Sequence, residues 1–297
     1  MQEQPTIYSK EQEKHYMDLF LDVARNKPKQ FNLACDSQVD FQISEHTKDK
    51  IVQLLVNGRN VGIVTNHEGY FEIEIQRYLC SLFNNQLGGN LKAFLLYSSP
   101  AVGHNVGGLL EARKPEYIES GLNLLGVVRE SDYKHEVYKH NINQKMEEES
   151  AINNRIFFGA LRGTGNLFFI PFEKTLEGGR IDPNTGKIKG IQSVNEKTCL
   201  SVFINCNCVL IPGGNDKTNE VINTNNHHKP SKNLLNAVIS GVPSKNTTAT
   251  FCLVNSFFDS ISLRDLGQDN QKITHEIILE IARSISPEGR GVYSQHV

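Results

Sequence analysis

Apolar residues follow two kinds of spacing along this chain of 297 residues. Spacings of three and four predict amphipathic helices over residues 9–26, 51–57, 71–82, 131–161, 193–203 and 273–285. Short continuous apolar runs, typical of strands buried on both faces, occur at residues 61–65, 92–97, 124–128, 167–170, 208–211 and 248–254. Because strands and helices alternate, we expect an α/β fold with a mixed, largely parallel central sheet and helices on both faces.

Two stretches depart from this alternation. Residues 1–57 show mainly helical spacing, so we expect a helical N-terminal lead-in there and an α/β domain over residues 58–297. Residues 213–233 are rich in Asn, Lys and His and contain few apolar residues. That composition predicts a mobile loop without regular structure.

Composition and charge exclude several classes of protein. The formal net charge of −2 provides no basic field, so we expect no nucleic-acid partner. Every apolar run is shorter than the roughly 18 residues that read as a membrane span. The polar, acidic start of the chain and six cysteines in a long sequence favour a reduced, cytoplasmic setting without a disulfide framework.

The strongest candidate for chemistry lies where the strand at residues 61–65 runs into the next helix. His67 stands at this corner, and Glu72 follows five residues later, close enough to fold back to the ring. A carboxylate that holds one ring nitrogen leaves the other nitrogen as a proton acceptor. The alternative is structural, with His67 capping the helix and Glu72 serving as a solvated acid in its first turn.

Three further polar segments follow predicted strands, where ligands of open α/β sheets gather. They carry Arg129, the turn formed by Glu177, Gly178, Gly179 and Arg180, and finally Pro212. Adjacent glycines allow backbone N–H groups to approach a ligand, and a flanking arginine is a forked donor suited to phosphate. Taken singly, each segment also has a structural explanation: a surface ion pair, a simple turn and the end of a strand.

In this order, the four segments resemble the glycerolipid acyltransferases, the family of glycerol-3-phosphate and lysophosphatidate acyltransferases. That family has the blocks N-H-x-x-x-x-D, a strand with a glycine and then an arginine, F-P-E-G-x-R, and an apolar strand ending in proline. The similar residues are Asn66, His67 and Glu72, then residues 126–129, residues 177–180 and residues 209–212. The proline at position 183 is similar to the soluble plastid-type branch. The resemblance covers roughly residues 58–215.

Some positions depart from the family pattern. Glu72 stands where the family has aspartate, and Thr175 and Leu176 replace the Phe-Pro of the third block. A second stretch, residues 286–290, reads Ser-Pro-Glu-Gly-Arg and is a closer literal match to that block. We assign the third block to residues 177–180 nevertheless, because residues 286–290 follow a helix rather than a strand.

The resemblance implies transfer of an acyl group from a thioester to a hydroxyl. His67 would be the general base, oriented by Glu72. The backbone N–H groups of Gly178 and Gly179 would stabilise the developing oxyanion. The co-substrate would be acyl-CoA or acyl carrier protein, and neither a cofactor nor a metal is implied.

The remaining candidate residues would bind the substrates. Arg129 and Arg180 would hold the phosphate of glycerol 3-phosphate or of a lysophospholipid. Glu177 would fix the glycine turn or contact an acceptor hydroxyl. Pro212 would line the acyl pocket, although core packing explains its apolar surroundings equally well.

Two alternatives remain open at this stage. The departures at Glu72 and at residues 175–176 fit a non-catalytic lipid- or acyl-binding protein on the same fold. A zinc site is a further possibility, since Cys199, Cys206 and Cys208 precede the pair at residues 227–228, His-His. The cysteine spacing matches no standard zinc finger.

Peripheral contact with a membrane is a separate question, raised by the lipid acceptor that the resemblance implies. The candidate surfaces are the apolar faces of the helices over residues 9–26 and 273–285. Neither helix has a strongly basic polar face, so we expect both to pack against the core.

Overall fold

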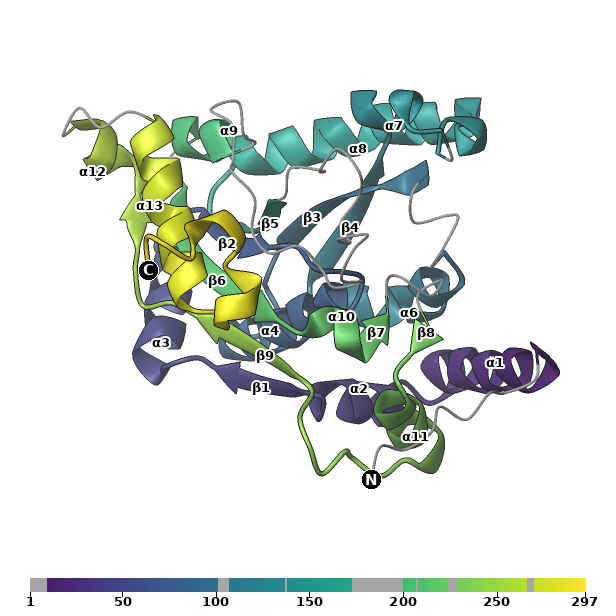
Figure 1. Ribbon diagram of the computed structural model, residues 1–297. Helices are drawn as coiled ribbons and strands as arrows, with labels where there is room; N and C mark the ends of the chain where they lie inside the picture. The colour runs from purple at the N-terminus through teal and green to yellow at the C-terminus, as the bar shows by residue number, and fades with distance from the viewer. Residues whose placement is uncertain are drawn as a thin grey trace.

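The computed structural model describes residues 10–100, 107–136, 138–172, 200–206, 208–223, 229–265 and 270–297. Its centre is a mixed, mostly parallel sheet of eight strands in the order β1-β9-β6-β2-β5-β3-β4, with β10 paired to β6 (Figure 1). The strands are β1 (Val39–Gln42), β2 (Val61–Asn66), β3 (Ala93–Ser98), β4 (Leu122–Val127), β5 (Leu167–Phe172), β6 (Val209–Asp216), β9 (Ala249–Leu253) and β10 (Phe258–Asp259). The predicted α/β class is confirmed.

Helices cover both faces of the sheet (Figure 1). One side carries α1 (Lys10–Asn26), α2 (Pro28–Asp36), α3 (Glu45–Val56), α4 (Glu72–Gln86), α6 (Gly107–Glu119) and α11 (Lys232–Ser240). The other side carries α7 (Glu130–Lys134), α8 (Gln144–Arg162), α9 (Leu200–Asn205), α12 (Ser260–Asp265) and α13 (Asn270–Arg283). Smaller elements are η1 (Lys139–Asn141), α10 (Thr218–Val221), the hairpin of β7 (Ile222–Asn223) and β8 (Lys229–Pro230), η2 (Pro287–Gly289) and η3 (Gly291–Tyr293). Each face of the sheet has its own apolar core.

Several elements were not predicted from the spacing of apolar residues. The lead-in contributes β1 to the main sheet, where β1 runs parallel to β9. Pro115 lies inside α6, and proline disfavours a helix interior, which explains why the sequence did not suggest this helix. The division of the chain at residue 57 stays a prediction. The start of the helix expected at residues 193–203 lies outside the described residues.

The prediction that a strand ends at Pro212 is wrong, because β6 continues to Asp216. Pro212 lies opposite Val64 of β2, and its carbonyl accepts from Val254 N at 2.9 Å. On its other edge, β6 pairs with β10 up to Leu210 and with β9 only from Gly213 onward. Pro212 therefore lies at the step where β6 changes neighbours on this edge, a position at which a sheet tolerates a missing N–H.

The expected loop over residues 213–233 is likewise wrong for the residues that the structure describes. Residues 213–216 belong to β6, and the segments α10, β7, β8 and the start of α11 follow. The polar composition misled the prediction because Asn215 is buried and its amide binds Asn66 inside the fold. Residues 224–228 lie outside the described residues.

A buried ionic network ties α2, α4 and α6 together. Glu74 of α4 is 1% exposed and accepts hydrogen bonds from Arg77 Nε at 2.9 Å and Arg113 Nε at 3.2 Å. Tyr117 OH donates to the same carboxylate at 2.8 Å, and Arg77 also pairs with Asp36 of α2. Burial alone would raise the pKa of Glu74, but the two guanidinium groups outweigh it and hold the pKa at about 2.

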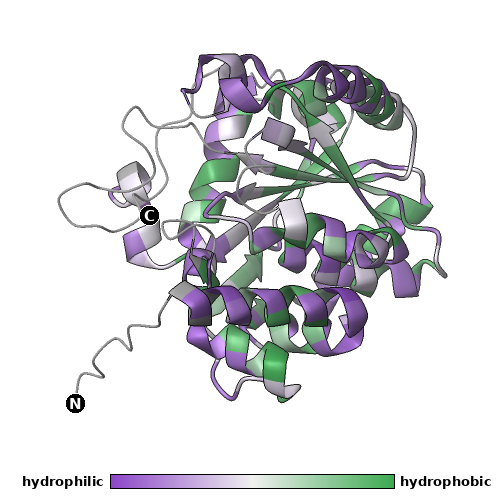
Figure 2. Ribbon diagram, turned by 90° about the vertical axis from the view of Figure 1, so that its right-hand side faces the viewer, coloured by the Kyte–Doolittle hydropathy of each residue, from purple (hydrophilic) through white to green (hydrophobic). Residues whose placement is uncertain are grey.

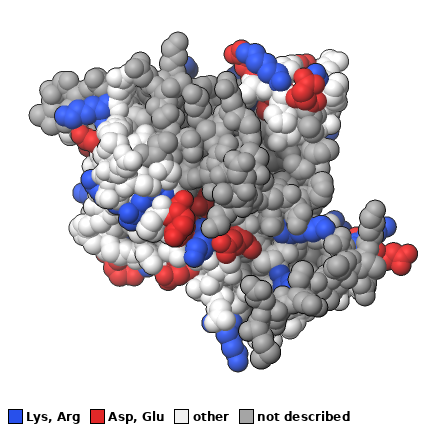
Figure 3. Space-filling view, viewed as in Figure 1, with Lys and Arg blue, Asp and Glu red and all other residues white. Residues whose placement is uncertain are grey.

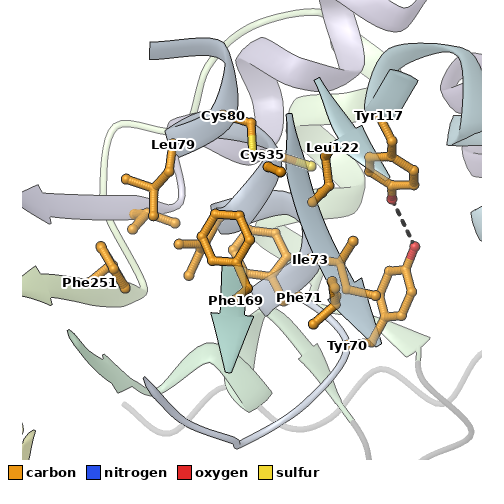
Figure 4. Packing of buried hydrophobic residues seen from close by; sticks show 14 of the residues in the cluster. Cys35, Tyr70, Phe71, Ile73, Leu79, Cys80, Tyr117, Leu122, Phe169 and Phe251 are labelled. Carbon is orange, nitrogen blue, oxygen red and sulfur yellow. Dashed lines mark hydrogen bonds between the residues drawn. The ribbon is translucent and has the colours of Figure 1, made fainter. Parts of the chain in front are cut away.

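The network also reaches the chain between β2 and α4. Tyr70 OH lies 3.1 Å from Tyr117 OH, and the two hydroxyls face each other inside the apolar core (Figure 4). Phe71, the next residue, is 1% exposed in the same core. Both apolar and polar contacts therefore fix the turn between β2 and α4, which carries His67.

We expect Glu74→Gln to lower the free energy of unfolding by about 3 kcal/mol, since two buried arginines would lose their counter-charge. The contribution of Glu74 is present above its ordinary pKa of 4.5 and is lost as pH falls toward 2, because its pKa is lowered in the folded protein. Urea unfolding at several pH values measures both effects. Glu45→Gln, which breaks the exposed pair with Lys48, is the control and should change stability by about 0.5 kcal/mol or less. Equal stability of Glu74→Gln and the native chain would contradict the prediction.

Candidate functional site

His67 directly follows β2, the most buried strand of the sheet. All six residues of β2 are buried between β5 and β6, which run parallel to it on either side. Five residues after His67, Glu72 opens α4, and its Oε2 lies 2.8 Å from His67 Nδ1. The predicted contact between ring and acid is therefore present.

Backbone N–H groups hold the carboxylate of Glu72 in place. Its Oε1 accepts from Gly69 N at 2.9 Å and from Glu68 N. The Glu72 side chain is 3% exposed, whereas the His67 side chain is 34% exposed. Because a carboxylate oxygen accepts, Nδ1 carries the proton and the neutral ring presents the lone pair of Nε2. The arrangement can thus place a base at the surface while its orienting acid stays inside.

A pair of asparagines fixes the ends of β2 and β6 against each other. Asn66 Nδ2 donates to the carbonyl of Asn215 at 2.8 Å, and Asn215 Nδ2 donates to the carbonyl of Asn66 at 2.7 Å. Asn215 N also donates to Asn66 Oδ1 at 2.7 Å. These three hydrogen bonds continue the contact beyond the last backbone pair, Thr65 with Gly213. His67 therefore starts from a fixed position.

Glu68 is a second buried acid at the same corner. Its Oε2 accepts from Thr218 N at 2.9 Å and lies 3.1 Å from Thr218 Oγ1, which connects the corner to α10. Burial raises the pKa of Glu68 to about 8, and the charges of Glu72 and Asp216 add to the rise against the donors of Thr218. Glu68 is thus mostly protonated at neutral pH.

Lys217 brings a cation to the same strand end. Among the described residues it is the one non-glycine with a positive φ, at 60°, and its side chain is exposed. It lies between Asp216, the last residue of β6, and Thr218, which binds Glu68. A left-handed conformation costs a lysine about 1–2 kcal/mol, and such strain often marks a functional position.

Arg129 lies at the same edge of the sheet but farther along it. β4, which it follows, is separated from β2 by β3 and β5, all parallel. At a strand spacing of about 4.8 Å, the ends of β2 and β4 are roughly 14 Å apart. Arg129 is exposed, and its Nη2 donates to the carbonyl of Leu96 at 3.4 Å. The structure thus places Arg129 on the edge predicted for ligands, and its role in binding stays a prediction.

Gly126, the glycine of the second block, has a structural requirement. A Cβ at this position would lie 2.3 Å from Ser99 Oγ and 2.9 Å from Tyr97 OH. These polar groups therefore approach the end of β4 closely, and any side chain at position 126 would push both of them away from the strand.

The other sequence candidates are not brought to the corner by the described part of the chain. Glu177, Gly178, Gly179 and Arg180 lie outside the described residues, as do Thr175 and Leu176. Pro212 is buried within β6, three residues before Asn215. Its predicted place in an acyl pocket stays a prediction.

The described residues give no support to the alternative of a zinc site. No group of three or more His, Cys, Asp and Glu side chains there is placed to hold a metal ion. The free cysteines of the described chain are Cys35, Cys80, Cys206, Cys208 and Cys252. Cys199 and the histidines at residues 227–228 lie outside it.

No helix within the described ranges has the length and apolar character needed to cross a bilayer.

No protein-family model matches the chain, and no curated protein sequence matches it significantly.

Sequence reasoning missed Glu68, Lys217, Thr218 and the asparagine pair. Asn66 enters the sequence analysis only as the asparagine of the first block, and Asn215 lies in a stretch predicted to be a loop. Glu68 and Thr218 are separated by 150 positions, so no local spacing relates them. The one signal for this pair in the sequence is that each asparagine comes shortly after an apolar run, Asn66 after residues 61–65 and Asn215 after residues 208–211.

We expect Glu68 to lower the free energy of unfolding as the pH rises from about 4.5 to about 8. A carboxyl with a raised pKa in the folded state binds a proton that the unfolded chain has released, so rising pH costs stability over that window. Glu68→Gln keeps an acceptor for Thr218 and should flatten this decline, by about 1.4 kcal/mol for each unit of pKa shift.

Chemical denaturation across this pH range measures the effect. Glu220→Gln, an exposed acid on α10, is the matched control and should leave the decline unchanged. A Glu68→Gln variant with the pH profile of the native chain would show that Glu68 is ionised in the folded protein at neutral pH.

Proposed function

We propose that the chain is an O-acyltransferase. It moves a fatty acyl group from acyl-CoA or acyl carrier protein to a hydroxyl of glycerol 3-phosphate or of a lysophospholipid. The observation that carries the proposal is the 2.8 Å contact between His67 Nδ1 and Glu72 Oε2 at the carboxyl end of a central parallel strand. The order of the four sequence segments supports this reaction over other uses of a histidine base.

In this proposal His67 Nε2 accepts the proton of the acceptor hydroxyl as its oxygen attacks the thioester carbonyl. The C–O bond forms, the carbonyl electrons move to its oxygen, and the resulting imidazolium is stabilised by Glu72. When the tetrahedral intermediate collapses, the C–S bond breaks and the imidazolium returns its proton to the leaving thiolate. No external base or oxidant is needed.

Lys217 is our candidate for the first contact with the acceptor's phosphate. It is an exposed cation that directly follows β6, the strand next to the one that leads to His67. A dianionic phosphate requires a cation close to the hydroxyl that reacts, since glycerol 3-phosphate is short. Arg129 and Arg180 would complete the binding of phosphate from the other loops.

We expect His67→Ala to lower acyl transfer roughly 10²–10⁴-fold, the usual contribution of a positioned general base. Glu72→Gln should also lower the rate, because an amide can donate to Nδ1 and favour the wrong tautomer. The measurement is transfer of labelled acyl groups from acyl-CoA to a panel of phosphorylated glycerol and lysolipid acceptors.

His46→Ala, a change at an exposed histidine of α3, serves as the control and should keep full activity. Transfer that survives His67→Ala would remove this residue from the mechanism. Tight binding of acyl-CoA without turnover on any acceptor would instead favour the non-catalytic acyl-binding alternative.

We expect Lys217→Gly to separate stability from binding. Glycine adopts a positive φ without strain, so the free energy of unfolding should rise by about 1 kcal/mol. Loss of a charged hydrogen bond should raise KM for glycerol 3-phosphate roughly tenfold, with kcat little changed. Urea unfolding and steady-state kinetics measure the two effects.

Lys217→Arg keeps both the charge and the backbone strain, so its stability and KM should stay near those of the native chain. A Lys217→Gly variant with an unchanged KM would assign the strain at this position to the turn alone.

A further inference from the structure

The two helices first considered for membrane contact bury their apolar faces. In α1, Phe20, Val23 and Ala24 are at most 6% exposed, and in α13 the isoleucines at 273, 277, 278 and 281 are at most 1% exposed. Neither face is available to a partner. Exposed apolar side chains lie on several elements, including α8, and one group of them lies on α2, α11 and the chain after α11. These elements are at the bottom of the molecule in Figures 1 and 2.

Two hydrogen bonds define the contact between α2 and the end of α11. Gln30 Nε2 donates to the carbonyl of Val238 at 2.7 Å, and Ser37 Oγ accepts from Ser244 N at 2.9 Å. Leu33 lies between Gln30 and Ser37 on the same side of α2, three and four residues from them. Its side chain therefore stands beside the segment over residues 238–244.

Three apolar side chains at this contact are turned to solvent. Leu33 is 52% exposed, Val242 is 61% exposed and Ile239 is 37% exposed. They come from two segments packed against each other, so together they form one small apolar tip rather than scattered surface residues.

The same tip is basic. Lys27 and Lys29, at the start of α2, and Lys245, in the chain after α11, are exposed. Residues 232–248 contain no Asp or Glu, and the acid of residues 27–37 is Asp36, which pairs with buried Arg77. In Figure 3 the lower tip of this face shows a basic side chain and no described acidic one.

We propose that this α2–α11 tip (Lys27, Lys29, Leu33, Ile239, Val242 and Lys245) docks on an anionic lipid membrane. The apolar side chains would enter the boundary between headgroups and acyl chains, while the lysines would lie at the anionic headgroups. Each lysine near such a surface contributes about 1 kcal/mol. Basic residues around an apolar centre are the pattern that peripheral membrane contacts use.

Other partners fit this surface less well. Nucleic acid would bind the lysines but would leave the exposed leucine and valine without an apolar partner. A second copy of the chain meeting the tip symmetrically would bring six lysines together, and their repulsion opposes such a dimer. The membrane satisfies both the charge and the apolar centre.

The chain connects this tip to the candidate site. After Thr218, which binds Glu68, the chain runs through α10 and the β7–β8 hairpin into α11, and Ser231 N donates to the carbonyl of Val221 at 2.8 Å. The docking itself does not depend on the chemistry proposed for His67.

Co-sedimentation of the full chain with vesicles tests the proposal in the absence of any substrate. Binding is expected to phosphatidylcholine vesicles that contain phosphatidylglycerol, not to phosphatidylcholine alone, and added salt should weaken it. The double variant Leu33→Ser/Val242→Ser should bind at least about tenfold more weakly. The triple variant Lys27→Gln/Lys29→Gln/Lys245→Gln should lose roughly 100-fold, from about 1 kcal/mol per lysine.

The matched control is Ile152→Ser/Ile156→Ser on α8, across the sheet, where the two side chains are 50% and 46% exposed. This variant should bind vesicles like the native chain. Circular dichroism checks that all variants, which change surface residues, remain folded. Activity on soluble glycerol 3-phosphate should be unaffected by the tip variants, so failure of docking and failure of catalysis are distinguishable.

Three results would overturn the proposal. The first is no binding to anionic vesicles at low salt, or equal loss in the α8 control. The second is binding that needs only the lysines and is matched by binding to RNA, which would point to an acidic macromolecule. The third is a dimer in sedimentation velocity that the Leu33→Ser/Val242→Ser variant dissociates, which would assign the tip to self-association.

Discussion

The burial of β2 between β5 and β6 is the constraint on which the rest of the molecule depends. Parallel pairing on both edges leaves this strand no freedom to shift, and the asparagine amides extend that pairing to its last residue. His67 is the first residue released from it. A reactive group placed directly after a rigid strand needs little further ordering, and backbone N–H groups supply the rest by holding Glu72.

Two buried acids near this strand show how partners decide the state of a carboxyl. Glu74 is surrounded by two guanidinium groups and stays ionised to low pH. Glu68, at nearly the same depth, has acids and a single hydroxyl-bearing residue around it and keeps its proton. The first acid stabilises the packing of three helices, and the second gives the corner an uncharged group that binds Thr218.

The sequence was sufficient to predict the α/β architecture and the contact between His67 and Glu72, but not the residues around that contact. Continuous apolar runs located β2 and β5 because both faces of these strands are covered, and the five-residue spacing of His67 and Glu72 sufficed to place them in contact. Residues whose role depends on distant chain segments could not be identified from local sequence spacing. Thr218 meets Glu68 only through the folding of β6 beside β2, and the polar end of β6 is a strand because it pairs with β9, while Asn215 binds Asn66. Arg113 was missed for the same reason, since its acid lies on another helix.

Pro212 has a consequence for the folding of this sheet. A proline offers no donor, so it is tolerated at the one step where β6 changes neighbours from β10 to β9. Sliding β6 by a single residue would move that ring to a step that requires a donated hydrogen, and would also turn every side chain of the strand to the opposite face. The imino acid thereby selects against misregistered pairing, and the register that it favours is the one in which Asn66 and Asn215 face each other.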